Sequence, residues 1–173
     1  MCEPSANSNA PQLTNRDLQE FRVYRVRLEQ FLHLILLHTK VKEGAEVPEN
    51  VMRHGSKEFA STLQVATLGW LASLVDQNPS AMNVFKLWSR LFPWRQTEIE
   101  AVRTAIQPHL DTLKTFRDEV AFHANKSFAR QVRAYEAVTT PELSQATDQF
   151  LQLCISLVRE EDSIPALRRE MAK

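Results

Sequence analysis

Glycine is scarce in this 173-residue chain, and the scarcity argues against several common nucleotide-binding sites. The three glycines are Gly44, Gly55 and Gly69, which are widely separated. Neither a phosphate-binding P-loop nor the glycine-rich fingerprint of dinucleotide-binding folds can be assembled from them, because both motifs need clustered glycines. The sequence therefore argues against most nucleotide-dependent enzymes of the α/β folds.

Cysteines and long apolar runs are also scarce. Cys2 and Cys154 are far apart, so no disulfide framework is predicted, which is typical of a protein in the reducing cytosol. The first residues, MCEPSANSNAPQ, lack the apolar stretch of a signal peptide. The most apolar run, residues 31–37, is too short to span a bilayer. We therefore expect a cytoplasmic protein that does not insert into a membrane.

Neither sign of charge is in excess. The 21 basic and 21 acidic residues cancel, so no overall field attracts the chain to nucleic acid or to a membrane surface. Any site for a polyanion must therefore be local. The hydrophobic content of 43% and the length of the chain suit a single domain with a substantial core.

Strand-like alternation of apolar and polar residues does not recur, and helical spacing does. We predict an all-α fold, a compact helical bundle of about five helices in which the fourth helix is kinked. The expected helices cover roughly residues 14–41, 56–77, 80–92, 97–125 and 139–161. Residues 1–13 are expected to be a disordered tail, residues 14–162 a single helical domain, and residues 163–173 a short C-terminal tail. The stretch 127–138 stays open between a loop and a turn of helix.

Threonines paired with acids three residues later predict several helix starts. These pairs are Thr14 with Asp17, Thr97 with Glu100, and Thr139 with Glu142. Pro108 lies within the fourth helical pattern and should kink or split it. The first helix is apolar nearly all round from Phe31 onward, which predicts a central position for its C-terminal half.

The most informative stretch covers residues 110–126, LDTLKTFRDEVAFHANK. Its apolar residues fall on one helical face, and Arg117 lies on the same face between Leu113 and Val120. An arginine in an apolar stripe is costly unless something pairs with it. Either a buried acid satisfies Arg117, or Arg117 faces a cleft that binds an anion.

His123 lies about 120° round a straight helix from Arg117. Histidine can exchange a proton near neutral pH, and arginine can hold a phosphate through two hydrogen bonds. Together they supply what RNA cleavage without a metal needs. One histidine gives a single proton-transfer group, and a two-fold dimer would supply the second.

Other candidate sites are weaker. His33 and His38 are about 140° apart on a helix, which does not suit zinc, so no metal or cofactor is expected. The acid pairs at residues 118–119 and 160–161 are interpreted as solvated faces. Arg22, Arg25 and Arg27 form either a solvated basic face or a phosphate-contacting patch.

The segment FRDEVAFHANK resembles the signature of the HEPN superfamily, an arginine and a polar residue followed after a short gap by histidine. The matching residues are Arg117, Asp118 and His123, and the form is most similar to the abortive-infection (AbiU-type) branch. Residues 70–88, a helix ending in Asp76 followed by a break and a short helix, are similar to that branch too. The resemblance covers roughly residues 16–161, and its specific part is the short signature.

The resemblance implies a homodimer joined through the signature helices, with a metal-independent endoribonuclease site in the shared cleft. The expected context is a toxin–antitoxin, phage-defence or RNA-processing system, with RNA as substrate and an antitoxin or regulator protein as partner. In this site His123 would transfer the proton, Arg117 would stabilise the phosphate, and Asp118 would orient the pair. By proximity alone, further residues are expected to line the cleft and bind RNA, namely Asn125, Lys126, Arg130 and Arg133.

Two other functions stay open. Many members of the superfamily resemble non-catalytic interaction or sensor modules, in which Arg117 would fix an interface through a buried ion pair. A regulator could instead bind a small ligand among Trp70, Trp88 and Trp94, although tryptophans of this kind more often belong to a core.

Overall fold

The computed structural model describes residues 13–42, 56–78, 81–121 and 127–172, and the regular elements in these ranges are all helical. The prediction of an all-α fold is confirmed. The α-helices are α1 (Asn15–Lys42), α3 (Ser56–Leu74), α4 (Val84–Leu91), α5 (Gln96–Ile106), α6 (Leu110–Phe116), α7 (Phe128–Val138), α8 (Pro141–Glu161) and α9 (Pro165–Met171). Short segments of other helical geometry complete the order, namely the 3₁₀ turns η1 (Pro93–Arg95) and η2 (Gln107–His109) and the π-helical turn η3 (Arg117–Ala121).

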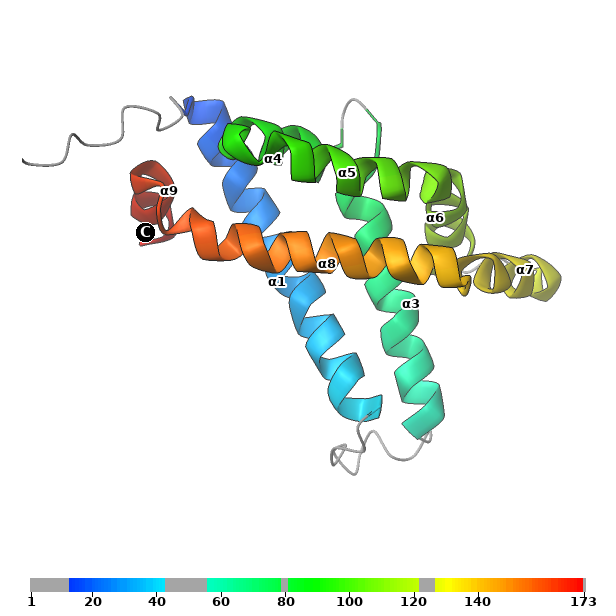
Figure 1. Ribbon diagram of the computed structural model, residues 1–173. Helices are drawn as coiled ribbons and strands as arrows, with labels where there is room; N and C mark the ends of the chain where they lie inside the picture. The colour runs from blue at the N-terminus through cyan, green and yellow to red at the C-terminus, as the bar shows by residue number, and fades with distance from the viewer. Residues whose placement is uncertain (1–12, 43–55, 79–80, 122–126, 173) are drawn as a thin grey trace, which may run out of the picture.

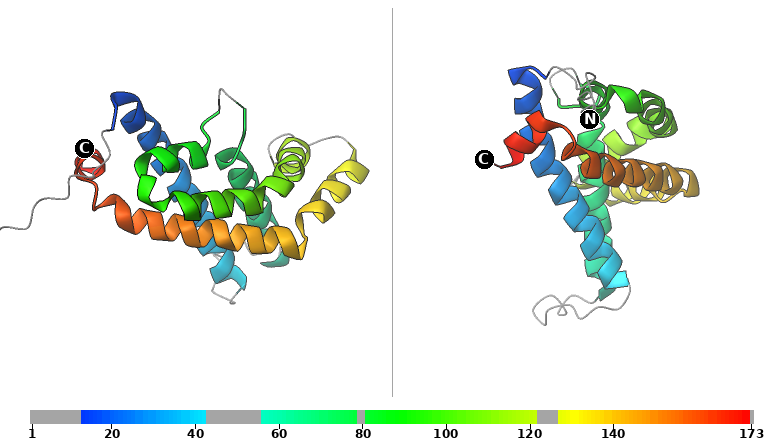
Figure 2. Two further views of the ribbon diagram at one scale, coloured as in Figure 1. Left: turned by 45° about the horizontal axis from the view of Figure 1, so that its top comes forward. Right: turned by 60° about the vertical axis from the view of Figure 1, so that its left-hand side comes forward.

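The helices form two crossing layers (Figures 1 and 2). In one layer α1 and α3 pack side by side. In the other, α4 and α5 run along α8, which crosses the first pair. The α6–α7 pair closes one end of this second layer, and α9 lies at the other end against α1. The turn η3, which carries Arg117, is therefore held where α3, α6 and α7 meet.

An aromatic cluster fills the space between the layers. The ring of Phe150 on α8 lies 5.4 Å from that of Trp88 and 5.9 Å from those of Phe31 and Phe85. Two of these three pairs meet edge to face, an arrangement that aromatic quadrupoles favour. Phe150, Trp88 and Phe31 are completely buried. The cluster therefore joins α1, α4 and α8 into one core.

The expected helix starts are only partly right. Thr14 caps α1, since its hydroxyl accepts the Asp17 amide at 3.2 Å and its own amide donates to that carboxylate at 2.9 Å. The box predicted for Thr97 and Glu100 is wrong, because α5 continues directly from η1 and begins at Gln96 without a side-chain cap. The cap of α8 is Thr140 rather than Thr139, and its side chain accepts the Leu143 amide.

The predicted kink at Pro108 is confirmed. The path from α5 to α6 tightens into η2 around this proline, which lacks the amide that a regular helix needs there. Residues 127–138, which the sequence left open, form α7. The tail predicted for residues 1–13 lies almost wholly outside the described residues.

The prediction that the C-terminal half of α1 is central is wrong. This half extends past α8 (Figure 1), and α3 is the helix beside it in the part of the chain that the structure describes. Phe31 is buried, but Leu36 and Leu37 are 53% and 43% exposed. The sequence showed an apolar circumference, and it did not show that the second layer ends before the helix does.

The interpretation of Glu160 and Glu161 as a solvated face is also wrong. Glu161 is completely buried where α8 ends, and its Oε2 accepts a hydrogen bond from Nη1 of Arg25 at 2.8 Å. Glu160 pairs with Arg95 and accepts from the Trp94 indole at 3.0 Å.

The arginines at the start of α1 are engaged in similar pairs. Arg22 pairs with Glu170 of α9, and Arg25 bonds to Glu29 as well as to Glu161. These two arginines therefore attach the C-terminal segment to α1 instead of forming a free basic patch.

Candidate functional site

Asp76 satisfies the arginine that interrupts the apolar stripe. Nη1 of Arg117 donates to Oδ2 of Asp76 at 2.5 Å, and the two side chains are each 19% exposed. Asp76 follows the last turn of α3 and comes 41 positions before Arg117 in the chain. The ion pair therefore ties the end of α3 to the signature stretch.

The backbone around Asp76 is itself fixed. Asn83 caps α4 by accepting the Lys86 amide at 3.2 Å, and its Nδ2 donates to the carbonyl oxygens of Val75 and Asp76 at 3.2 and 3.0 Å. The Asn78 amide donates to Oδ1 of Asp76 at 2.9 Å. The polar break between α3 and α4 thus presents the carboxylate in one orientation.

Asp118 holds the other side of the guanidinium. Nε of Arg117 donates to Oδ1 of Asp118 at 2.9 Å, and Asp118 is 45% exposed. No partner for Nη2 of Arg117 is found among the described residues. Two carboxylates therefore orient the guanidinium and leave donors to spare, which is the arrangement that binding an additional oxygen anion needs.

The charges in this cluster stabilise each other. Hydrogen bonds to Asp76 and then Asp118 raise the pKa of Arg117, so it stays cationic. Burial acts to raise the pKa of Asp76, but the Asn78 amide and the Arg117 guanidinium outweigh burial and place that pKa below its ordinary value. Both partners of the ion pair are therefore charged at neutral pH.

A hollow of about 350 Å³ opens beside the ion pair, between the end of α3 and α6. The charged residues in its lining are Asp76, Asp111, Lys114 and Arg117. Lys114 precedes Arg117 by one helical turn and brings a second cation to the same face. Two acids balance the two cations, so this hollow alone carries no net charge.

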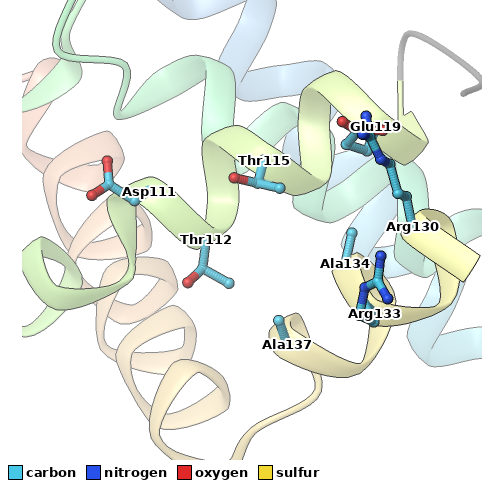
Figure 3. Close-up of a pocket in the computed structure, with 8 residues that line it drawn as sticks. All are labelled: Asp111, Thr112, Thr115, Glu119, Arg130, Arg133, Ala134 and Ala137. Carbon is cyan, nitrogen blue, oxygen red and sulfur yellow. The ribbon is translucent and has the colours of Figure 1, made fainter.

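A second hollow, of about 390 Å³, lies on another face of α6, toward α7 (Figure 3). Thr112 and Thr115 line it from α6, and Arg130 and Arg133 line it from α7. The side chain of Arg130 extends toward Glu119 on η3 (Figure 3). The two arginines predicted to bind RNA thus share a hollow with each other, and Arg117 lines a different one.

The turn that carries Arg117 is π-helical. The amide of Arg117 donates to the carbonyl oxygens of both Leu113 and Lys114, where the hydrogen-bonding pattern changes. A π turn advances by a smaller angle per residue than an α-helix, and such turns occur often at functional sites. The 120° angle between Arg117 and His123 was worked out for a straight helix, and His123 lies outside the described residues.

The predicted site residues differ in how far the structure places them. Arg117 and Asp118 are in contact, and Arg130 and Arg133 lie together across α6 from them. The remaining predicted residues, His123, Asn125 and Lys126, lie outside the described residues.

Sequence reasoning gave no role to Asp76 or Lys114. Lys114 lies three positions before Arg117, so helical spacing predicts that the two side chains share a face. For Asp76 there were two signals: an arginine in an apolar stripe needs an acid, and the resemblance placed Asp76 at the end of a helix in residues 70–88.

The three tryptophans occupy different environments. Trp88 is completely buried in the aromatic cluster, and Trp70 packs partly buried against the core. Trp94 is 50% exposed on η1. They therefore do not act as a shared set of ligand contacts.

Within the ranges that the structure describes, no three His, Cys, Asp or Glu side chains gather closely enough to hold a metal ion. None of the described helices is both long and apolar enough to cross a bilayer. No protein-family model matches the chain, and no similar curated protein or solved structure is found.

Proposed function

We propose that this protein is a HEPN-like, metal-independent endoribonuclease that acts at a homodimer interface, in a toxin or phage-defence context. The observation that carries the proposal is the oriented guanidinium of Arg117. Two carboxylates hold it, Nη2 has no described partner, and Lys114 lies on the same face of a hollow. An arginine fixed in this way can receive a phosphate without losing side-chain freedom on binding.

The proposed reaction is transfer of the phosphoryl group within the RNA. The ribose 2′-oxygen attacks the adjacent phosphorus, its proton goes to a histidine, and the bond from phosphorus to the 5′-oxygen breaks. A second histidine protonates the leaving oxygen, so the products are a 2′,3′-cyclic phosphate and a 5′-hydroxyl. His123 and the partner subunit's His123 supply the two groups. Arg117 stabilises the charge that builds on phosphorus, and Asp118 keeps its guanidinium in place.

The test is cleavage of a single-stranded RNA pool in EDTA by four forms of the protein. We expect wild type and His33→Ala to cleave equally, because His33 is exposed on α1 and lies outside residues 110–126. His123→Ala should lose at least about 100-fold in rate, the lower bound for a missing proton-transfer group. Arg117→Lys should lose about 100-fold while retaining the charge, because lysine cannot reproduce the two-sided anchoring. RNA cleavage that survives His123→Ala would contradict the mechanism.

A non-catalytic interaction module is the second candidate, and one observation favours it. Arg117 already bridges α3 and η3 through Asp76, which is a sufficient structural role for an arginine in an apolar stripe. This reading predicts a stable dimer that cleaves no RNA. It also predicts that Arg117→Ala destabilises the fold or dissociates the dimer, by a few kcal/mol for a largely buried pair.

A further inference from the structure

A cationic hollow adjoins the hollow of Arg117. It measures about 510 Å³ and lies between the end of α3, α4 and α5. Its lining includes the polar side chains Gln77, Asn83, Lys86, Ser89, Arg90 and Arg103. No carboxylate appears in this lining, whereas acids and bases cancel in the hollow of Arg117. In a chain of zero net charge, the cationic hollow is a local source of positive potential.

The three cations of this hollow differ in how far they are neutralised. Arg90 pairs with two acids of α1, Asp17 at 2.7 Å and Glu20. Arg103 contacts Glu100 on its own helix at 3.3 Å, and both side chains are about half exposed, which makes the pair weak. Lys86 is exposed and forms no ion pair with any described residue. The net positive charge therefore comes from Lys86 and Arg103.

The two hollows meet at one residue. Gln77 lines both, and its Nε2 donates to Oε1 of Gln107 on η2 at 3.1 Å. This bridge lies between Arg103 on one side and Lys114 with Arg117 on the other. A linear ligand bound at Arg117 therefore reaches the cationic hollow by passing Gln77.

We propose that Lys86 and Arg103 bind backbone phosphates of a single RNA strand whose reacting phosphate lies at Arg117. This inference rests on the proposed function, and it adds the path that the substrate takes. Because the hollow of Arg117 has no net charge, it cannot attract a polyanion by itself. The adjoining cations supply that attraction.

The lining also indicates how selective the contact is. The ammonium of Lys86, the guanidinium of Arg103 and the hydroxyl of Ser89 all donate hydrogen bonds, which suits phosphate oxygens. Phe85, the aromatic residue of the lining, is only 5% exposed and offers little surface for a base to stack on. Binding through this hollow should therefore depend on phosphates and little on sequence.

The test measures binding, so it does not require cleavage. A fluorescent 2′-O-methyl RNA, which cannot form a cyclic phosphate, is titrated with wild type, Lys86→Gln/Arg103→Gln and Arg168→Gln/Arg169→Gln at several salt concentrations. The last variant is the matched control, because it also removes two exposed positive charges, from α9, which does not line the cationic hollow. All substituted side chains are exposed, so we expect all three proteins to melt alike.

Wild type should bind with an affinity that falls as salt rises. For a single strand the logarithmic slope is about −0.7 for each phosphate contact, so losing two contacts should make the slope shallower by about 1.4. Lys86→Gln/Arg103→Gln should show this change, and the control should keep the wild-type slope. Equal slopes in all three proteins, or equal losses in both variants, would overturn the proposal.

Two further results separate this inference from the proposed function. If wild type binds RNA through the hollow but cleaves none, the nuclease proposal fails and the hollow stands. If wild type cleaves RNA and Lys86→Gln/Arg103→Gln retains the same KM, the hollow fails and the nuclease stands. Inorganic phosphate and unlabelled oligonucleotide can each be used to displace the fluorescent RNA. If inorganic phosphate displaces it as effectively per phosphate group, the hollow is a small-anion site and the proposal is contradicted.

Discussion

Glu161 should make the stability of this protein depend on pH in an unusual direction. Its side chain is completely buried, Oε2 accepts from Arg25, and Oε1 has no hydrogen-bond partner among the described residues. Burial raises the pKa of Glu161 from 4.5 to about 7. The positive charge of Arg25 acts to lower this pKa, and the negative charges of Asp162 and Glu29 act to raise it. The fold therefore favours the neutral carboxyl.

The sign and size of the effect follow from this difference. A carboxyl whose pKa is raised by folding contributes its full stabilisation below pH 4.5 and loses it as the pH rises through about 7. A difference of about 2.5 in pKa corresponds to about 3 kcal/mol in the free energy of unfolding. For a chain of this size that amounts to about 6–12 °C in melting temperature.

The assay compares thermal melts of wild type, Glu161→Gln and Glu136→Gln across this pH window. Glu161→Gln keeps the shape of the side chain and cannot ionise, so the difference between its curve and that of wild type isolates this one carboxyl. Glu136 is exposed on α7, and its substitution should leave the wild-type profile unchanged. If Glu161→Gln and wild type give parallel profiles between pH 4.5 and 8, the reasoning is refuted.

Three further predictions concern the ion pair, the core and the buried thiol. A double-mutant cycle on Asp76→Asn and Arg117→Gln, measured by urea unfolding, should give a coupling free energy of about 1–2 kcal/mol, which lies between the values for exposed and buried ion pairs. Additive effects of the two substitutions would show that the pair contributes nothing to stability. Phe150→Ala should lower the free energy of unfolding by about 3–5 kcal/mol, because this ring contacts three others at the centre of the core, and a loss below 1 kcal/mol would contradict this packing. Cys154 is completely buried, and burial raises its pKa well above the ordinary value. Peptide mapping should therefore find it unmodified by iodoacetamide in the native protein and alkylated in urea. Rapid native labelling would mean that α8 opens around this residue.

Sequence patterns predicted the helices well because their signals are local. Thr14 and Asp17 mark the start of α1, and Pro108 marks the kink, through hydrogen bonds made or lost within one turn. The failed box at Thr97 shows the limit of such signals. A helix that continues from η1 has no free start to cap, and whether the preceding residues are helical is not a property of the box itself.

The site was less predictable because its contacts are distant in sequence. The apolar stripe showed that Arg117 needs a carboxylate, but the packing of α3 on α6 and η3 decided that Asp76 supplies it. Glu161 was taken for a surface acid because Glu160 beside it is acidic too. The position of Arg25 on the neighbouring helix, which allows one of the two acids to be buried, is set by the tertiary fold.

We propose that Arg117 and His123 cleave RNA without a metal, through the ribose 2′-hydroxyl. The most direct test incubates a random RNA pool and a 2′-O-methyl pool of the same composition with purified protein in EDTA, and analyses the products by mass spectrometry. We expect cleavage of the RNA pool alone, with 2′,3′-cyclic phosphate ends, and loss of this cleavage with His123→Ala. Cleavage of the 2′-O-methyl pool, or intact RNA in the presence of a stable dimer, would contradict it.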